Sequence, residues 1–183
     1  ATNWVINPSI ESTEVGMYTA AGSAIARSTD QAASGAASLL VNPANSAAGE
    51  GFYWESPMIP YSVGPQFLTV QLEHYGASAS GAVTLEIRAT DGTTVLATSG
   101  SSDLATSWTR LTAQYTVPGS TAATTYRLYL TSTAQHNINF YVDKIMFEVR
   151  EDTTAVSTYL DGSLGTLYNW TGIADASSSV KKP

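Results

Sequence analysis

Residues 66–75, QFLTVQLEHY, alternate apolar and polar side chains almost without interruption. Leu68, Val70 and Leu72 fall in one phase, and polar side chains fill most of the other. A period of two residues is typical of a β-strand that turns one face to a core and the other to solvent. The stretch therefore predicts a strand that covers one side of a hydrophobic core.

The same alternation recurs along the chain, and no segment indicates a long helix. Between turns rich in Gly, Pro, Ser and Asn, further strands are predicted at residues 24–28, 37–42, 51–58, 82–98, 108–117, 125–132 and 138–149. Asp91 and Gly92 mark a tight hairpin turn within 82–98. Roughly eight to ten short strands, each with one apolar face, predict an all-β fold, a two-sheet antiparallel β-sandwich (jelly roll).

The last predicted strand changes phase in its middle. Phe140 and Val142 keep one phase of the alternation, whereas Ile145 and Phe147 keep the other. One extra residue must therefore enter near Asp143, which is the signature of a β-bulge. The bulge is expected to change the direction in which Asp143 points.

The sandwich accounts for residues 1–150, and residues 151–183 form a C-terminal extension. The extension carries large side chains that would gain nothing if they were exposed on an unstructured tail. We therefore expect it to dock on the sandwich or on a neighbouring subunit. The predicted subunit-contact residues are Tyr159, Asp161, Tyr168 and Trp170.

Composition excludes several function classes. Asp and Glu outnumber Lys and Arg by 15 to 8, and the basic residues are scattered, so nucleic acid is not an expected partner. The chain has no cysteine, which excludes disulfides and thiol chemistry. It has no run of about 18 apolar residues, so membrane insertion is not expected.

Signatures of catalysis are weak. His74 and His136 are isolated, and no Gly-x-Ser-x-Gly motif occurs. Paired catalytic carboxylates need a deep cleft, which a sandwich of this size rarely forms. We therefore expect a non-enzymatic protein.

Outward-facing residues of the central strands are candidates for carbohydrate binding on one polar sheet face. They are Gln71, Glu73, Tyr75, Glu86, Arg88, Gln114 and Tyr129. Amides and carboxylates can bind pairs of sugar hydroxyls, while an aromatic ring covers the apolar side of the sugar. The alternative is an ordinary solvated face on which Glu86 and Arg88 pair with cross-strand neighbours, and the lack of a second aromatic platform favours it.

The run EGFYWESPMIPY, residues 50–61, is rich in aromatic side chains. Its alternation predicts that Phe52 and Trp54 fill the core while Tyr53 and Glu55 face outward. Tyr61 is left as a candidate contact residue.

Three segments together resemble carbohydrate-binding modules with a galactose-binding-like jelly roll. They are NPSIESTEVGMYTAAGSAIARSTDQAASGAASLLVN at 7–42, SWTRLTAQYTVP at 107–118 and INFYVDKIMFEV at 138–149. The resemblance covers about residues 3–150 and implies the jelly-roll fold. It also implies a structural Ca2+ held between Glu11 and Asp143, whose hard oxygen atoms suit calcium. The alternative is that Glu11 is a solvated turn residue and that Asp143 pairs with Lys144 or Arg150.

The extension resembles a signature that follows such jelly rolls in minor tail and other virion proteins of tailed bacteriophages. The matching residues are Tyr159-Leu-Asp161-Gly162, Tyr168-Asn-Trp170-Thr-Gly172 and Ala176-Ser-Ser-Ser179. This implies a virion structural or attachment protein (minor tail, fibre or capsid decoration) with other virion proteins as partners. Host-surface polysaccharide and homo-oligomer formation are further expectations. The rival hypothesis is a carbohydrate-binding module of a secreted bacterial glycoside hydrolase.

Overall fold

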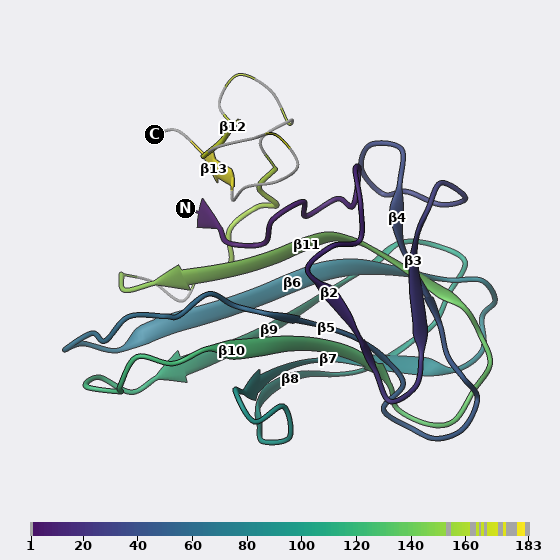
Figure 1. Ribbon diagram of the computed structural model, residues 1–183, viewed down its shortest axis with the longest axis horizontal. Coiled ribbons are helices and arrows are strands. Elements are labelled where there is room, and N and C mark those ends of the chain that lie inside the picture. Colours follow the sequence, from purple (N-terminus) through teal and green to yellow (C-terminus); the bar gives the residue numbers. More distant parts are fainter. Residues whose placement is uncertain are drawn as a thin grey trace.

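The structure is a computed structural model that describes residues 2–152, 155–161, 164, 166, 168–171, 174 and 179–181. Gly162, Gly172 and residues 176–178 of the extension motif lie outside these residues. Within them the fold is all-β, and no helix long and apolar enough to cross a membrane occurs among them. Two five-stranded antiparallel sheets pack face to face, as the alternation predicted (Figure 1).

Sheet I has the strand order β2-β5-β10-β7-β8. Its strands are β2 (Met17–Ala20), β5 (Gly51–Glu55), β10 (Tyr126–Ser132), β7 (Ala82–Ala89) and β8 (Val95–Asp103). Sheet II has the order β3-β4-β11-β6-β9. Its strands are β3 (Ala24–Ser28), β4 (Ser38–Asn42), β11 (Phe140–Arg150), β6 (Gln66–Gly76) and β9 (Thr109–Val117).

The core lies between the two sheets and consists of the apolar phases of the strands. Fully buried members include Phe52, Leu85 and Leu130 from sheet I, and Val70 and Phe147 from sheet II. Trp54 is also buried, at 5% exposure, which confirms the predicted inward phase of β5. Large side chains from both inner faces thus remove apolar area from water, which is the main stabilising contribution to the fold.

The predicted bulge in β11 is confirmed. The pairing of β11 with β6 shifts register between Asp143 and Met146, and Lys144 has a positive φ of 53°. The residue after Lys144, Ile145, is therefore not paired with β6. Its backbone N–H donates instead to Pro8 O at 2.9 Å.

A third, small sheet brings the two ends of the chain together above β11 (Figure 1). It has the order β1-β13-β12, formed by β1 (Thr2–Asn3), β13 (Ser179–Lys181) and β12 (Tyr168–Trp170). Asn3 is fully buried where this sheet meets the sandwich. Its Nδ2 donates to Ile145 O and to Leu160 O, each at 3.0 Å, and its Oδ1 accepts Phe147 N at 3.1 Å.

His74 connects the two large sheets at one end of the core. It is fully buried on β6, and its Nε2 lies 3.0 Å from Ser102 Oγ on β8. Burial lowers the pKa of His74, because the charged imidazolium is poorly solvated there. The folded protein therefore holds this imidazole neutral.

We expect His74 to make stability depend on pH below its ordinary pKa of about 6.5. The unfolded chain takes up this proton at a higher pH than the folded one, so the contribution of His74 to stability is full above about 6.5 and is lost as the pH drops through the lowered pKa. Urea unfolding of the wild type and His74→Gln between about pH 5 and 8 measures this. An equal slope in the two proteins would show that His74 is not the cause.

Candidate functional site

The seven predicted carbohydrate-binding residues lie on two opposite outer faces. Glu86, Arg88 and Tyr129 belong to sheet I, on β7 and β10. The others, Gln71, Glu73, Tyr75 and Gln114, belong to sheet II, on β6 and β9. The prediction of one shared face is therefore wrong, because the consecutive strands β6 and β7 enter different sheets. Whether either set binds sugar stays a prediction.

On sheet I, three tyrosines from three neighbouring strands form a stack, which we call the tyrosine ladder. Backbone register places Tyr18 beside Tyr53, and Tyr53 beside Tyr129. The ring centroids are 5.1 and 4.9 Å apart, with interplanar angles of 24° and 16°. Cross-strand aromatic pairs of this kind stabilise the sheet and fix the ring positions. Exposure falls along the ladder, from 51% for Tyr18 to 7% for Tyr129.

Charged side chains hold the inner end of the tyrosine ladder. The guanidinium carbon of Arg88 lies 4.0 Å from the Tyr129 ring centroid. Arg88 Nε also donates to Glu86 Oε2 at 2.7 Å, and Arg88 Nη1 to Gly92 O at 3.0 Å. Glu86 and Arg88 thus pair with each other along β7, and not with cross-strand partners as the sequence alternative predicted. The hairpin turn at Gly92 has φ of 73°, as the sequence Asp91-Gly92 predicted.

A second ion pair lies beside the middle of the ladder. Arg127 Nε donates to Glu55 Oε2 at 2.6 Å, and its guanidinium carbon lies 5.1 Å from the Tyr53 ring centroid. Both side chains remain partly exposed, at 25% and 37%. The ladder is therefore flanked by hydrogen-bonding groups that are already oriented.

The exposed end of the ladder borders a cavity of about 400 Å³ at the β2 edge of sheet I. Its lining residues are Trp4, Ile6, Val15, Gly16, Tyr18, Trp54, Glu55, Ser56 and Pro57. The lining is mostly apolar and aromatic with a few polar groups, and such cavities suit small-molecule ligands. Tyr18 of the ladder lines this cavity, and so does Glu55 of the ion pair beside the ladder.

Sequence reasoning missed most of this site. Tyr53 and Glu55 were expected to face outward, but residues 17–20 were not predicted as a strand, so Tyr18 had no assigned partner. Alternation shows which side chains face outward, whereas the ladder depends on which strands are neighbours. The cross-strand register of β2, β5 and β10 is the signal that was lacking.

On sheet II, the predicted residues are spread along the outer face. Tyr75 packs against Trp108 and Tyr141, with ring centroids 5.6 and 6.1 Å apart. Glu73 Oε1 accepts Lys144 Nζ at 3.1 Å. Gln114 Nε2 donates to Thr69 Oγ1 at 3.4 Å.

Gln71 is 2% exposed on the same face. Its Nε2 donates to Ser157 O at 3.0 Å and contacts Met146 Sδ at 2.8 Å.

Glu11 and Asp143, the residues that the resemblance implied for calcium, both anchor the loop at 33–37. The buried Asp143 accepts Ala33 N and Ser34 N at 2.7 and 2.8 Å through Oδ2, and Lys144 N at 2.6 Å through Oδ1. Burial raises the pKa of Asp143 to about 7, with a smaller contribution in the same direction from the charge of Glu11. The N–H donors act in the opposite direction, because they stabilise the charged carboxylate. Side-chain pairing with Lys144 or Arg150 does not occur, because these cations pair with Glu73 and Asp152.

Glu11 is bound to the same loop by its carboxylate. Oε1 accepts Ala36 N and Ala37 N at 3.0 and 3.2 Å, and a Cβ on Gly35 would lie only 2.1 Å from Oε1. N–H groups cannot coordinate a cation, and no cluster of three metal-binding side chains occurs among the described residues. The carboxylate oxygens of Glu11 and Asp143 therefore already accept backbone N–H groups, and calcium binding stays a prediction.

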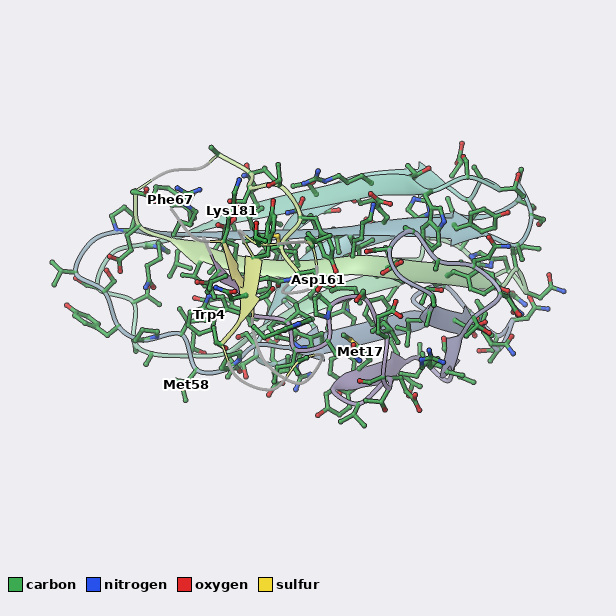
Figure 2. The ribbon with its side chains drawn as sticks, turned by 90° about the horizontal axis from the view of Figure 1, so that it is seen from above. Trp4, Met17, Met58, Phe67, Asp161 and Lys181 are labelled. Carbon is green, nitrogen blue, oxygen red and sulfur yellow. The ribbon has the colours of Figure 1, made fainter. Side chains whose placement is uncertain are left out.

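The extension makes contacts within its own chain. Asp161 is fully buried and its Oδ2 accepts Ser9 Oγ at 2.9 Å and Tyr159 Oη at 3.0 Å. Burial and the neighbouring Asp161 raise the pKa of Tyr159, so its hydroxyl stays protonated. Figure 2, which looks down on the extension, shows Asp161 over the middle of the sandwich. Tyr168 and Trp170 are half-buried on β12, and their role as subunit contacts stays a prediction.

No protein-family model and no curated protein matches the chain, but solved structures share its fold. A xylan-binding CBM22-1 domain from Paenibacillus barcinonensis is 18% identical, with a TM-score of 0.58 over 85% of this chain and 99% of that domain. A cyclase from Fischerella sp. TAU is 11% identical, with a TM-score of 0.64 over 84% of this chain and 99% of that one.

An arabinose-bound α-L-arabinofuranosidase is 17% identical, with a TM-score of 0.61 over 81% of this chain. The chain spans about a quarter of that enzyme's length, 26%. The chain therefore has the jelly-roll fold found in carbohydrate-binding modules.

We expect millimolar calcium or a chelator to shift the thermal unfolding midpoint by less than about 1 °C, because the carboxylates of Glu11 and Asp143 already bind N–H groups. Asp143→Asn should lower the midpoint, since an amide cannot accept all three N–H donors. Differential scanning calorimetry measures both effects. A rise of several degrees on adding calcium, lost in Asp143→Asn, would establish the metal site.

We expect Leu160→Ala to lower the free energy of unfolding by about 2–4 kcal/mol, because Leu160 is 1% exposed and its loss leaves a cavity. The matched control Leu164→Ala removes the same atoms from a side chain that is 43% exposed and should cost under about 0.5 kcal/mol. Denaturant unfolding and sedimentation measure stability and oligomeric state together. If Leu160→Ala leaves stability unchanged but dissociates an oligomer, the extension is an assembly contact.

Proposed function

We propose that the protein is a non-catalytic carbohydrate-binding module, and that the outer face of sheet I binds the polysaccharide. The observation that supports this most directly is the tyrosine ladder, which runs from the interior of sheet I to an aromatic cavity of about 400 Å³ at the sheet edge. The jelly-roll fold shared with xylan-binding domains supports the same function and makes xylan the first polysaccharide to test.

The chemistry of this face suits a sugar chain. A sugar ring has an apolar side that an aromatic face covers and hydroxyl groups that need polar partners. Tyr18, whose ring stacks on Tyr53 on one side and is 51% exposed, supplies the accessible aromatic surface, and Trp4 adds a second in the cavity. Glu55 supplies a hydrogen-bond acceptor and Arg127 supplies donors. The two side chains already hold each other in place, so they need not become ordered when the sugar binds.

The cavity lacks the residues that hydrolysis would need. Glycoside cleavage commonly requires a pair of carboxyl groups on opposite sides of the bond. Among the described lining residues only Glu55 is acidic, and it is paired with Arg127. Binding without cleavage is therefore the function that this geometry supports.

This proposal selects the secreted carbohydrate-binding module over the virion protein. The virion hypothesis rests on the motif in the extension, and the solved structures that share the fold lend it no support. Asp161 of that motif accepts hydrogen bonds from Ser9 of the chain's own N-terminal segment and from Tyr159 of the extension itself.

We expect Tyr18→Ala and Tyr53→Ala each to weaken binding to the preferred neutral polysaccharide at least about tenfold, because each removes apolar contact area that the sugar would cover. Affinity electrophoresis against xylan, mixed-linkage β-glucan and arabinan, followed by calorimetry, measures this. Tyr61→Ala is the matched control, because Tyr61 is 55% exposed and lies outside the ladder and the cavity. Unchanged affinity in both ladder variants would rule this face out.

A further inference from the structure

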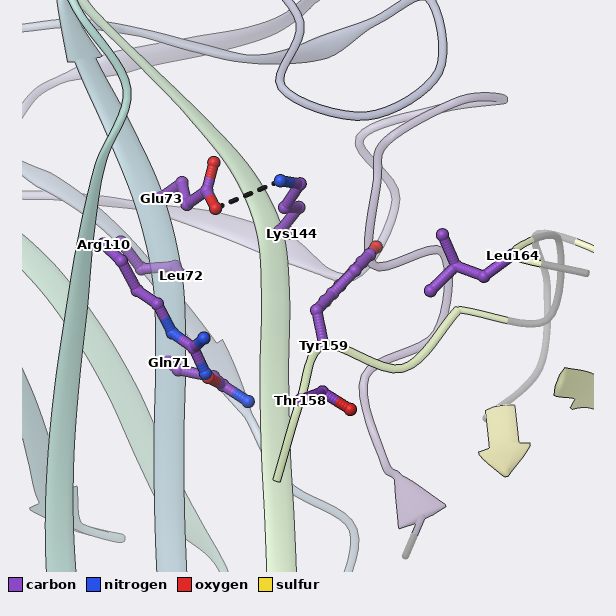
Figure 3. A pocket seen from close by; sticks show the side chains of 8 residues that line it. All are labelled: Gln71, Leu72, Glu73, Arg110, Lys144, Thr158, Tyr159 and Leu164. Carbon is purple, nitrogen blue, oxygen red and sulfur yellow. Dashed lines mark hydrogen bonds and ion pairs between the residues drawn. The ribbon is translucent and has the colours of Figure 1, made fainter. Parts of the chain in front are cut away.

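A second cavity, of about 300 Å³, lies on the outer face of sheet II (Figure 3). Its lining residues are Gln71, Leu72, Glu73, Arg110, Lys144, Thr158, Tyr159 and Leu164. Strands β6, β9 and β11 supply the floor and one side, and the extension supplies the other side through Thr158, Tyr159 and Leu164. The sandwich alone would leave this cavity open, so the extension completes it.

The charges that line this cavity are mostly positive, in a protein whose net charge is −7. Lys144 is paired with Glu73 at 3.1 Å. The Arg110 side chain pairs with no carboxylate within the described part of the chain, and its one side-chain hydrogen bond there goes from Nη2 to Ser157 O at 3.2 Å. Most donors of this guanidinium are therefore available, and a guanidinium recognises a carboxylate with two parallel hydrogen bonds.

Gln71 adds an unused acceptor at the floor of the cavity. Its Nε2 is held by Ser157 O and Met146 Sδ, which fixes the amide. Its Oε1 is buried and has no hydrogen-bond partner. A buried acceptor without a donor is unfavourable, and a ligand hydroxyl would relieve that cost. In Figure 3 the Gln71 amide lies next to the Arg110 guanidinium, while Lys144 rises from β11 and Tyr159 lies on the other side of that strand.

We propose that this second cavity binds an acidic sugar, a uronic acid unit of a polysaccharide. Its carboxylate accepts hydrogen bonds from Arg110, and a ring hydroxyl donates to Gln71 Oε1. Lys144 adds favourable charge at short range, while Tyr159 and Leu164 cover the apolar side of the sugar. A uronic acid carries both a carboxylate and hydroxyl groups on one small ring. The carboxylate suits the unpaired guanidinium of Arg110, and a hydroxyl suits the amide oxygen of Gln71, which has no donor.

The inference rests on the proposal that the protein binds carbohydrate, but it concerns the opposite sheet. The tyrosine ladder lies on sheet I, and the acidic-sugar cavity on sheet II. Because the two sites lie on opposite sheets, each would bind its own polysaccharide chain. Variants on one face leave the other face intact, so the two proposals can fail independently.

The test is calorimetric titration of the full chain with two matched xylan fragments, neutral xylotetraose and an aldouronic acid that carries glucuronic acid on xylotriose. We expect the acidic fragment to bind at least about tenfold more tightly, and Arg110→Gln to abolish that preference, because a charge-assisted hydrogen-bond pair is lost. Raising the salt concentration should weaken the acidic fragment selectively. Arg150→Gln is the matched control, since Arg150 lies on the same sheet but lines no part of this cavity.

Each result bears on the inference. Retained preference in Arg110→Gln, equal affinity for the two fragments, or no binding of the acidic fragment would overturn it. If Arg110→Gln and Arg150→Gln both lose the preference for the acidic fragment, the effect of charge is non-specific and the inference is overturned as well. Tyr18→Ala should keep the acidic preference, whereas its loss there would place both ligands on sheet I. Thermal unfolding of every variant confirms that the fold is intact.

Discussion

The bulge in β11 is the constraint on which the N-terminal segment, the extension and the second cavity depend. Without the extra residue at Lys144, the inner face of β11 could not carry both Val142 and Ile145 into the core. The bulge also leaves the backbone of Ile145 unpaired with β6. Ile145 N then donates to Pro8 O, and Ile145 O accepts Asn3 Nδ2, so the N-terminal segment is fixed to the sandwich at this point.

The consequences of the bulge reach both ends of the chain. Asn3, held by Ile145, also donates to Leu160 O, which attaches the extension to the N-terminal segment. On the outer face, Asp143 anchors the loop at 33–37, and Lys144 pairs with Glu73 at the mouth of the second cavity. One added residue in one strand thus positions a loop, a terminus and a wall of a candidate site.

The sequence pattern predicted the elements better than their arrangement. Alternation identified β6, β7, β10 and the inner phase of β5, and the change of phase located the bulge, because burial of one face imposes period two on each strand separately. Alternation carries no information on which sheet a strand enters. Glu86 and Gln71 were therefore assigned to one face although β7 and β6 lie in opposite sheets. Alternation could not predict the ladder either, because it does not show which strands are neighbours. Tyr18 and Tyr129 are far apart in sequence, and each stacks on Tyr53.

Sheet I is the proposed binding face for neutral polysaccharide, at the exposed end of the tyrosine ladder. The chain has four tryptophans, and their positions report on different surfaces. Trp4 and Trp54 line the cavity beside Tyr18, whereas Trp108 packs against Tyr75 on sheet II and Trp170 lies on β12. The most direct measurement follows the four indole N–H signals by NMR during titration with the neutral oligosaccharide that binds most tightly. We expect the signals of Trp4 and Trp54 to shift while those of Trp108 and Trp170 stay in place. Saturable binding that shifts Trp108 or Trp170 and leaves Trp4 and Trp54 unmoved would contradict it.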